Sequence, residues 1–536
     1  SWQWNQDHGY MIWNLYAAAG GHLTGKRIIS CEAMTNTRGV FKTSLEEIKQ
    51  HDDMNFITGI NHSVLHGFNY SPPEAGFPGW IRYGAYFSEQ NPWWPYLHRW
   101  VEYNARLSFI FQHSRPRKSI AIMGPTGDLW SETGLVRQPF HTRPWYLHRL
   151  WQPISQAGYS CEYLNQRAMQ DAEIVDGRIR YGPMSYRTLV LADVKSVHPG
   201  VARKIRQFVE EGGELVLIDR VPERSLHMTD SRKNDEMVRE VFSALVGQYP
   251  HSVFRLSSPA DRSMLNAWVY GWLEKLDLQP DVVIRVPDED VYQIYQATET
   301  KDIYFFTNVH RKDTAMIHAI FPTGGRIPYL WDPESGERWR YPFQSDAAEL
   351  DLVLPPLRSL LLVFEPDEKD LPVYPEFAPA LKGTYMARVD RPDRRWTVKG
   401  EHVNGTTCRW EMTELKDLST SPDSMKNSFA GRLIFSTQFE NTENISHIHL
   451  GETHRGVTEV YVNGALAGVN WYGEPLFPVG PLLRPGNNDL EIRYTTVLAN
   501  YCLELDDPVA RRWTVYEEKV PCGLEGPVWL MRYENP

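Results

Sequence analysis

The hydrophobic and polar positions of the first 113 residues switch repeatedly between a helical period and short apolar runs. The runs contain Ile and Val and are typical of strands, whereas the longer periodic stretches indicate helices. Ser44 is a plausible N-cap, and Gly20-Gly21 a plausible helix end. The predicted elements are helices over 9–19, 44–51 and 95–112 and strands over 27–30 and 56–66. This rhythm indicates βα units.

Residues 117–251 repeat the rhythm with more fully apolar strands. The predicted elements are strands over 119–123, 159–163, 188–192 and 214–218 and helices over 146–157 and 199–210. Continuous apolar runs are expected of parallel strands that are covered on both faces. We therefore predict a flavodoxin-like, doubly wound α/β domain of the glutamine-amidotransferase-like type. Its first turn, Gly124 to Asp128, is not G-x-G-x-x-G, which favours a structural role over nucleotide binding.

From residue 252 onward the pattern becomes that of a β protein. Apolar or alternating runs occupy 291–298, 303–309, 314–321 and 360–364, and no internal repeat is visible. Asn463-Gly464 between two runs predicts a tight hairpin turn. We predict two β-sandwiches, over 252–367 and 368–536, the second of the galactose-binding-like type.

The candidate chemistry lies on the first predicted strand, which leads into Cys31, Glu32 and Ala33. A carboxylate at the C-terminal end of a strand lies on the catalytic face of a (β/α)8 barrel. The expected fold is therefore multidomain, α/β plus β, and its residues 1–116 form the C-terminal half of such a barrel. The next strand and its loop carry candidate substrate contacts, namely Asn61, His62, His66, Tyr70, Trp80 and Trp93. Aromatic faces stack on sugar rings, and amide and imidazole groups order sugar hydroxyls, so this mixture suits a carbohydrate.

Simpler interpretations of these residues stay open. Glu32 could be a strand-end residue that pairs with Lys26 or Arg27. His62 and His66 share one strand face and could be core residues; without a third nearby Cys or His ligand, zinc is not favoured.

Two adjacent pairs in this region also have simpler interpretations. Trp93 and Trp94 cannot both face a site if the chain is extended there, so at least one belongs to the core. Asp52-Asp53 is predicted to be a solvated helix end.

Composition narrows the classes of partner. The chain has 536 residues, a formal net charge of -11 and 12% aromatic residues. An acidic chain has no footprint for phosphate backbones, so nucleic acid is not expected as a partner. No run of about 18 apolar residues occurs, so no membrane span is expected. The five cysteines are far apart, which favours free thiols over a disulfide framework, although one bridge among Cys408, Cys502 and Cys522 stays open.

Several motifs in order resemble glycoside hydrolase family 106, whose members are α-L-rhamnosidases. The motifs are GGHLTGK at 20–26, SCEA at 30–33, GINH at 59–62, HG at 66–67, YSP at 70–72, PGW at 78–80 and NPWW at 91–94. Tyr103, Ala105 and Arg106 continue the set on the following helix. Each motif alone is weak, but the ordered set is specific.

The resemblance implies an exo-acting, inverting enzyme that releases L-rhamnose from plant-type glycans or glycosides, with Glu32 as the general base. Inversion also needs a general acid, which the family carries on an earlier strand that has no match here. Glu74 and Glu89 are the acids on the loop that follows the second strand. No cofactor is required by the sequence; by resemblance an active-site Ca²⁺ is allowed for, with no ligands assigned. A periplasmic or secreted location is expected.

A whole barrel takes about 250 residues, more than precede the doubly wound segment. We therefore expect the N-terminal barrel half to come from the same precursor or from another chain. Two other functions compete with the rhamnosidase: another barrel exo-glycosidase, β-galactosidase-like, and a non-catalytic carbohydrate-binding subunit.

Overall fold

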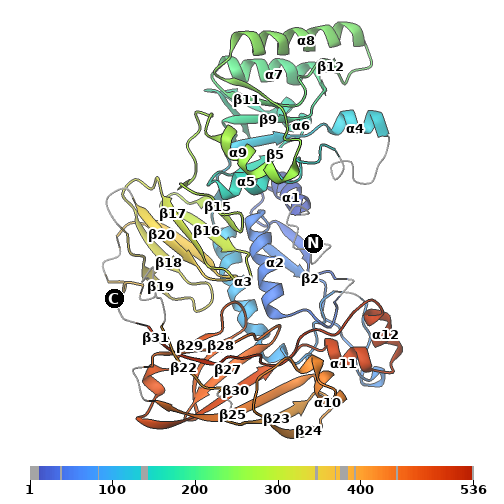
Figure 1. Ribbon diagram of the computed structural model, residues 1–536. Helices are drawn as coiled ribbons and strands as arrows, with labels where there is room; N and C mark the ends of the chain where they lie inside the picture. The colour runs from blue at the N-terminus through green and yellow to red at the C-terminus, as the bar shows by residue number, and fades with distance from the viewer. Residues whose placement is uncertain are drawn as a thin grey trace.

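The computed structural model describes residues 11–36, 39–82, 84–133, 143–343, 348–367, 370–374, 384–390, 394–441 and 445–533. Figure 1 shows a doubly wound region at the top, a yellow β region at the side and an orange-red β region below. The blue N-terminal helices α2 and α3 lie at the centre, next to both β regions. The N-terminal segment, residues 11–112, therefore lies between the other regions, and we call it the hub.

Among its described residues, the hub contains three long helices and a two-stranded parallel sheet, β1-β2. Its elements are α1 (Ile12–Leu23), β1 (Ser30–Ala33), α2 (Leu45–Ile57), β2 (His62–Leu65), η2 (Pro73–Ala75), η3 (Trp94–Tyr96) and α3 (Leu97–Gln112). The predicted N-cap of α2 is confirmed, because Ser44 and Glu47 form a capping box.

Three predicted boundaries in the hub are wrong. Helix α1 does not end at Gly20-Gly21 but continues to Leu23. Strand β1 lies later than predicted and includes Glu32 itself. Phe56 and Ile57, predicted as strand, are the last turn of α2 and are buried in the core. Short apolar runs suit a buried helix end as well as a strand, which explains this error.

The doubly wound region has a five-stranded parallel sheet in the order β13-β11-β9-β4-β5. Every residue of β4, β9 and β11 is buried, as the apolar runs predicted. The elements are β4 (Ile120–Met123), α4 (Thr126–Thr133), α5 (Trp151–Gln156), β5 (Cys161–Tyr163), α6 (Gln166–Asp171), β9 (Thr188–Ala192), α7 (Pro199–Glu210), β11 (Glu214–Ile218), α8 (Ser231–Gln248) and β13 (Val253–Leu256). Strand β13 lies beyond the predicted boundary at residue 251 yet pairs with β11.

Smaller elements complete this region. A three-stranded antiparallel sheet is formed by β6 (Glu173–Val175), β7 (Arg178–Tyr181) and β8 (Met184–Tyr186), and β10 (Ser196–Val197) pairs with β12 (Arg224–Ser225). Helix α9 (Leu265–Leu273), after η5 (Arg262–Met264), packs against α5.

The first β region consists of two sheets that share one core. One has the order β19-β18-β21-β16-β15-β3 and the other β14-β17-β20. Its strands are β3 (Arg115–Pro116), β14 (Val283–Ile284), β15 (Val291–Ala297), β16 (Asp302–Asn308), β17 (Ala315–Ile320), β18 (Ile327–Trp331), β19 (Arg338–Arg340), β20 (Glu349–Leu354) and β21 (Ser359–Glu365). Strand β3 comes from the range assigned to the barrel half but pairs with β15.

The last β region also has two antiparallel sheets around one core, in the orders β24-β23-β25-β30-β27-β28 and β22-β31-β26-β29. Its elements are β22 (Thr384–Arg388), β23 (Trp396–His402), β24 (Thr407–Met412), η6 (Leu418–Thr420), α10 (Ser424–Asn427), β25 (Gly431–Asn441), β26 (His447–His449), β27 (Val457–Val462), β28 (Ala465–Asn470), β29 (Leu476–Pro478), η7 (Gly480–Leu482), β30 (Gly486–Thr495), α11 (Ala499–Glu504), α12 (Pro508–Thr514) and β31 (Trp529–Arg532). The predicted turn at Asn463-Gly464 joins β27 to β28.

Two further predictions concern thiols and membranes. All five cysteines are free, as favoured, so Cys408, Cys502 and Cys522 form no bridge. Within the described ranges, no helix is both long and apolar enough to cross a bilayer.

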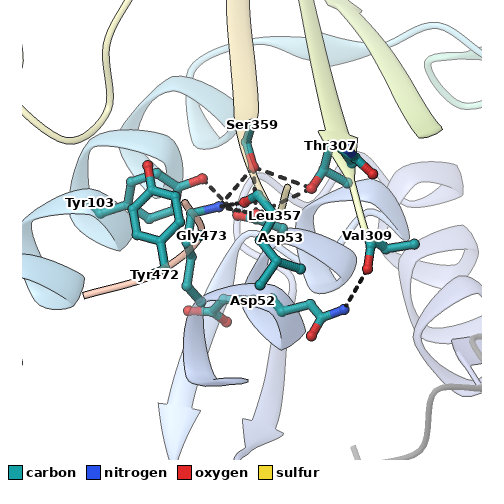
Figure 2. Close-up of polar contacts among 12 residues, drawn as sticks. Asp52, Asp53, Tyr103, Thr307, Val309, Leu357, Ser359, Tyr472 and Gly473 are labelled. Carbon is teal, nitrogen blue, oxygen red and sulfur yellow. Dashed lines mark hydrogen bonds and ion pairs between the residues drawn. The ribbon is translucent and has the colours of Figure 1, made fainter. Parts of the chain in front are cut away.

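A buried ion pair fixes the hub to both β regions. The Lys49 ammonium of α2 lies 2.6 Å from Asp53 Oδ2 and donates to the Ser359 hydroxyl of β21 at 2.9 Å. Figure 2 shows Asp53 among Tyr103, Ser359 and Thr307, and the Tyr103 hydroxyl donates to its Oδ1 at 2.7 Å. The Lys49 ammonium also lies 4.4 Å from the ring centroid of Tyr472, in the last β region. This junction holds three parts of the chain in one arrangement.

Candidate active site

The β1-β2 sheet has one covered face and one open face. Ser30 pairs with His62 and Glu32 with Val64, and all four side chains are exposed. The alternate residues point the other way, and Ala33 among them is packed in the core. Since strand residues alternate between faces, Glu32 stands at the C-terminal end of the open face.

Two polar side chains among the described residues lie against Glu32. The Thr35 hydroxyl donates to Glu32 Oε1 at 2.8 Å. His66 Nδ1 lies 3.0 Å from the Thr35 hydroxyl oxygen and 3.4 Å from Glu32 Oε1. The Glu32 side chain is still 64% exposed, so water reaches the carboxylate.

The backbone explains how this cluster forms. Met34 has a φ of 62°, an uncommon value for a residue with a side chain, and turns the chain directly after β1. The His66 amide donates to the Ala33 carbonyl at 2.9 Å, which continues the β1-β2 pairing to the cluster. Gly84 passes so close that a Cβ there would lie 2.0 Å from the His66 carbonyl oxygen, so this position requires glycine.

Each hydrogen bond in the cluster has a defined donor. An ionised carboxylate only accepts hydrogen bonds, so the Thr35 hydroxyl is the donor to Glu32. The Thr35 oxygen then accepts from Nδ1–H of His66, a tautomer inferred from this network. A water-exposed carboxylate fixed in this way can take a proton from a bound water, which is the role of a general base.

Large aromatic side chains follow β2 and reach solvent. Tyr70 is 73% exposed and Trp80 63% exposed. The Trp80 amide donates to the Ser71 hydroxyl at 2.9 Å, which ties two parts of this loop together. Exposed aromatics of this size are typical of a ligand-binding surface.

Three other predicted contacts lie elsewhere. Asn61 is buried before β2, where it accepts from the Ile29 amide at 2.9 Å, so it joins strands instead of facing a ligand. His62 is exposed on the open face, but at the opposite end of β2 from His66. Trp93 is 1% exposed and its indole N–H donates to the Thr43 carbonyl, so its assignment as a substrate contact is corrected to a core residue.

The prediction that Asp52-Asp53 is a solvated helix end is wrong, because both carboxyls are buried. Asp52 accepts from the Ser63 hydroxyl of β2 at 2.5 Å and from the indole N–H of Trp100, on α3, at 3.1 Å. Burial raises the pKa of the Asp52 carboxyl to about 6. Asp52 therefore fixes β2 to α2 and α3, a role for which the sequence offers only the unusual acid pair as a signal.

The other acids of the loop that follows β2 lie apart from one another. Glu74 is exposed on the η2 turn, and Glu89 lines a separate pocket with Asn404 and Tyr501. In the described part of the chain, no group of three or more His, Cys, Asp or Glu side chains could hold a metal ion. Within those residues no ligand set is therefore assigned to the calcium ion that the resemblance allows for.

The family model of glycoside hydrolase family 106, alpha-L-rhamnosidase, matches residues 5–345, and the chain belongs to this family. The structure matches the rhamnosidase from Novosphingobium sp. PP1Y with a TM-score of 0.71 and 22% identity, over 99% of this chain and 50% of that chain. This match shows a rhamnosidase-like fold.

A curated protein from Formosa agariphila, which carries the provisional name beta-glucuronidase, is 23% identical over 338 residues. The match covers 62% of this chain and 26% of that protein. The chain thus spans half the length of the rhamnosidase and about a quarter of the curated relative.

Proposed function

We propose that this chain carries one wall of the active site of an exo-acting, inverting α-L-rhamnosidase that releases L-rhamnose from plant-type glycans or glycosides. Family membership supports L-rhamnose as the released sugar, and the position of Glu32 supports its role as a general base. The single observation that carries the proposal is the water-exposed Glu32 carboxylate at a parallel strand end, hydrogen-bonded by Thr35 beside His66.

In this proposal Glu32 is the general base. Its carboxylate takes a proton from a water, and the water oxygen attacks the anomeric carbon of rhamnose from the face opposite the leaving group. A general acid on the other side protonates the leaving oxygen. His66 and Thr35 orient Glu32, and Tyr70 and Trp80 stack on the sugar or its leaving group.

The proposal includes further barrel strands from the same precursor or from another polypeptide, which also bring the general acid. The open face of the β1-β2 sheet supports this, because Val64 is 51% exposed there. Helix α3 has Val101 and Phe109 exposed, and their spacing of eight residues places them on the same side of the helix. Exposed apolar stripes of this kind mark surfaces that another element covers. We further propose that residues 1–116 form a half-barrel and that the two β regions are sandwiches.

A polymeric plant substrate is met outside the cytoplasm, so we propose a periplasmic or secreted location. The Formosa relative is named for another sugar, which makes β-D-glucuronides the necessary comparison.

The test uses the protein assembled with its completing barrel segment. Wild type is expected to hydrolyse 4-nitrophenyl α-L-rhamnoside and to leave the β-D-galactoside and β-D-glucuronide unchanged. Glu32→Gln is expected to lower kcat by about 10³-fold. Glu102→Gln, at an exposed helix position paired with Arg106, is the matched control. Activity of Glu32→Gln within a few-fold of wild type would remove Glu32 as the base.

A further inference from the structure

A basic pocket lies far from Glu32 in the sequence, where the β3–β4 link meets the β7–β8 hairpin. Its volume is about 370 Å³. Four basic side chains line it: Arg117, Lys118, Arg178 and Arg180. The other described residues that line it are Pro116, Ser119, Pro183, Met184 and Ser185, so none of its lining residues is acidic. This concentration of positive charge stands out in a chain with a formal net charge of -11.

Lys118 is the unusual member of this set, because it is only 9% exposed. It makes no side-chain hydrogen bond and no ion pair within 4.0 Å with any described residue. Its ammonium is not among the described buried polar atoms that lack a partner, so it reaches the open space of the pocket. One positive charge therefore faces the pocket without an ion pair to a described residue.

The carboxyls that interact with Lys118 over a longer range are Glu162 and Asp281. Both oxygens of Glu162 already have partners, His22 at 2.5 Å and the Tyr186 hydroxyl at 2.7 Å. Burial raises the pKa of the Asp281 carboxyl to about 7, so at neutral pH it neutralises Lys118 only in part.

The arginines are placed to complete an anion site. Arg178 and Arg180 are two residues apart on β7, so they share one face, while Ile179 between them is buried in the core. Arg178 has no ion pair with a described residue, and Arg180 has a long one of 3.8 Å with the exposed Asp176. Pairs of that kind contribute little, so both guanidinium groups are available to a ligand.

The hairpin that carries these arginines is fixed in place. At the turn of the hairpin, Gly182 has a φ of 54° and lies against the end of α1. A Cβ at this position would lie 2.2 Å from the Leu23 carbonyl oxygen. The close approach fixes the turn of the hairpin against α1, and a fixed scaffold lowers the cost of ordering a binding site.

We propose that this pocket binds one oxyanion group, a sulfate, phosphate or carboxylate, with the Lys118 ammonium as its point charge and the arginines as its forked donors. Guanidinium groups bind such oxyanions through two parallel hydrogen bonds, and the ammonium adds a point charge. The group can be a free ion or part of an acidic sugar. The site is independent of the proposed role of Glu32.

Isothermal titration of the purified chain in chloride buffer tests this. The probes are inorganic sulfate, inorganic phosphate and D-glucuronate, with neutral L-rhamnose as the uncharged comparison. Saturable one-to-one binding of at least one anion, and none of L-rhamnose at the pocket, is expected. Tighter binding of D-glucuronate than of both inorganic ions would assign the site to an acidic sugar, and the reverse order to a free ion.

Variants test whether the heat measured in the titration comes from binding in this pocket. Lys118→Met and Arg178→Gln should each weaken anion binding by about tenfold or more. Arg206→Gln changes a 53% exposed arginine on α7 and should leave binding unchanged. Because Arg178 is exposed, its replacement tests the site even if Lys118→Met disturbs folding. Absence of saturable anion binding, or equal affinity in Arg178→Gln and wild type, would overturn the proposal.

Discussion

The Thr35 hydroxyl donates a 2.8 Å hydrogen bond to Glu32 Oε1, and its oxygen lies 3.0 Å from His66 Nδ1. One hydroxyl thus joins the ends of two parallel strands at the carboxylate. In this arrangement the Thr35 hydroxyl bridges the Glu32 carboxylate and the His66 imidazole. Thr35 is therefore a positioning residue that orients Glu32.

Removing that hydroxyl tests whether the orientation matters. We expect Thr35→Val in the assembled protein to lower kcat by about tenfold, because one hydrogen bond to the carboxylate is lost. Thr35→Ser keeps the hydroxyl and should restore most of kcat. Steady-state kinetics with 4-nitrophenyl α-L-rhamnoside gives both values. Equal kcat in Thr35→Val and wild type would show that the hydrogen bond has no part in catalysis.

The exposed indole of Trp80 is expected to bind substrate. Trp80→Ala should raise KM by about tenfold with a smaller change in kcat, because stacking area is lost while Glu32 is unaffected. Trp130→Ala is the matched control, since that indole is also exposed but lies on α4 in the doubly wound region. If the two variants have the same KM, Trp80 is not a substrate contact.

Some of this site could be predicted from the sequence and some could not. The apolar run that ends in Glu32 locates the carboxylate, because strand ends in βα units collect functional groups. Asn61 and Trp93 are residue types that suit a sugar site. The sequence pattern alone does not show which way a side chain in a loop or at a strand end points. The positive φ of Met34, which turns the chain between Glu32 and Thr35, has no sequence signal, since Met is not a residue that favours it.

The same contrast holds for the fold. The buried strands β9 and β11 match their apolar runs residue for residue, because such runs have few other stable arrangements. The local sequence does not show that the acid pair Asp52-Asp53 is buried, because its partners come from β2, α3 and β21, far away in the chain. Tertiary hydrogen bonds, not local composition, decide whether such a pair is buried.

Asp52 predicts a particular pH dependence of stability. Its pKa is raised by burial from 3.8 to about 6, so the folded state keeps a proton that the unfolded state has released. Its contribution to stability is full below pH 4 and is lost as the pH rises to 6, a change of up to about 3 kcal/mol. Asp52→Asn removes this dependence.

Urea unfolding of wild type and Asp52→Asn at pH 4, 5 and 6 measures that change. The difference in unfolding free energy between the two proteins should fall steadily over this range. Asp176→Asn, at a side chain that is 86% exposed, is the control and should show no trend. A difference that stays constant or grows with pH contradicts the assignment.

The buried pair of Lys49 and Asp53 predicts a large loss of stability when one partner is removed. Lys49→Met leaves the buried Asp53 carboxylate without its cation and should lower the unfolding free energy by about 3–5 kcal/mol. The double variant Lys49→Met/Asp53→Asn should recover part of this loss. Lys399→Met, at an exposed pair with Glu401, should change stability by less than about 0.5 kcal/mol. Urea unfolding that finds Lys49→Met as stable as wild type would show that this junction does not hold the regions together.

The central claim is that Glu32 activates water in an inverting reaction, and the anomer of the first product tests it most directly. Proton NMR of the assembled protein acting on 4-nitrophenyl α-L-rhamnoside resolves the two anomers before they interconvert. Our account predicts that β-L-rhamnose appears first and that Glu32→Gln forms it about 10³-fold more slowly. Initial release of α-L-rhamnose would contradict it, because in a retaining reaction the carboxylate attacks the sugar itself and does not activate a water.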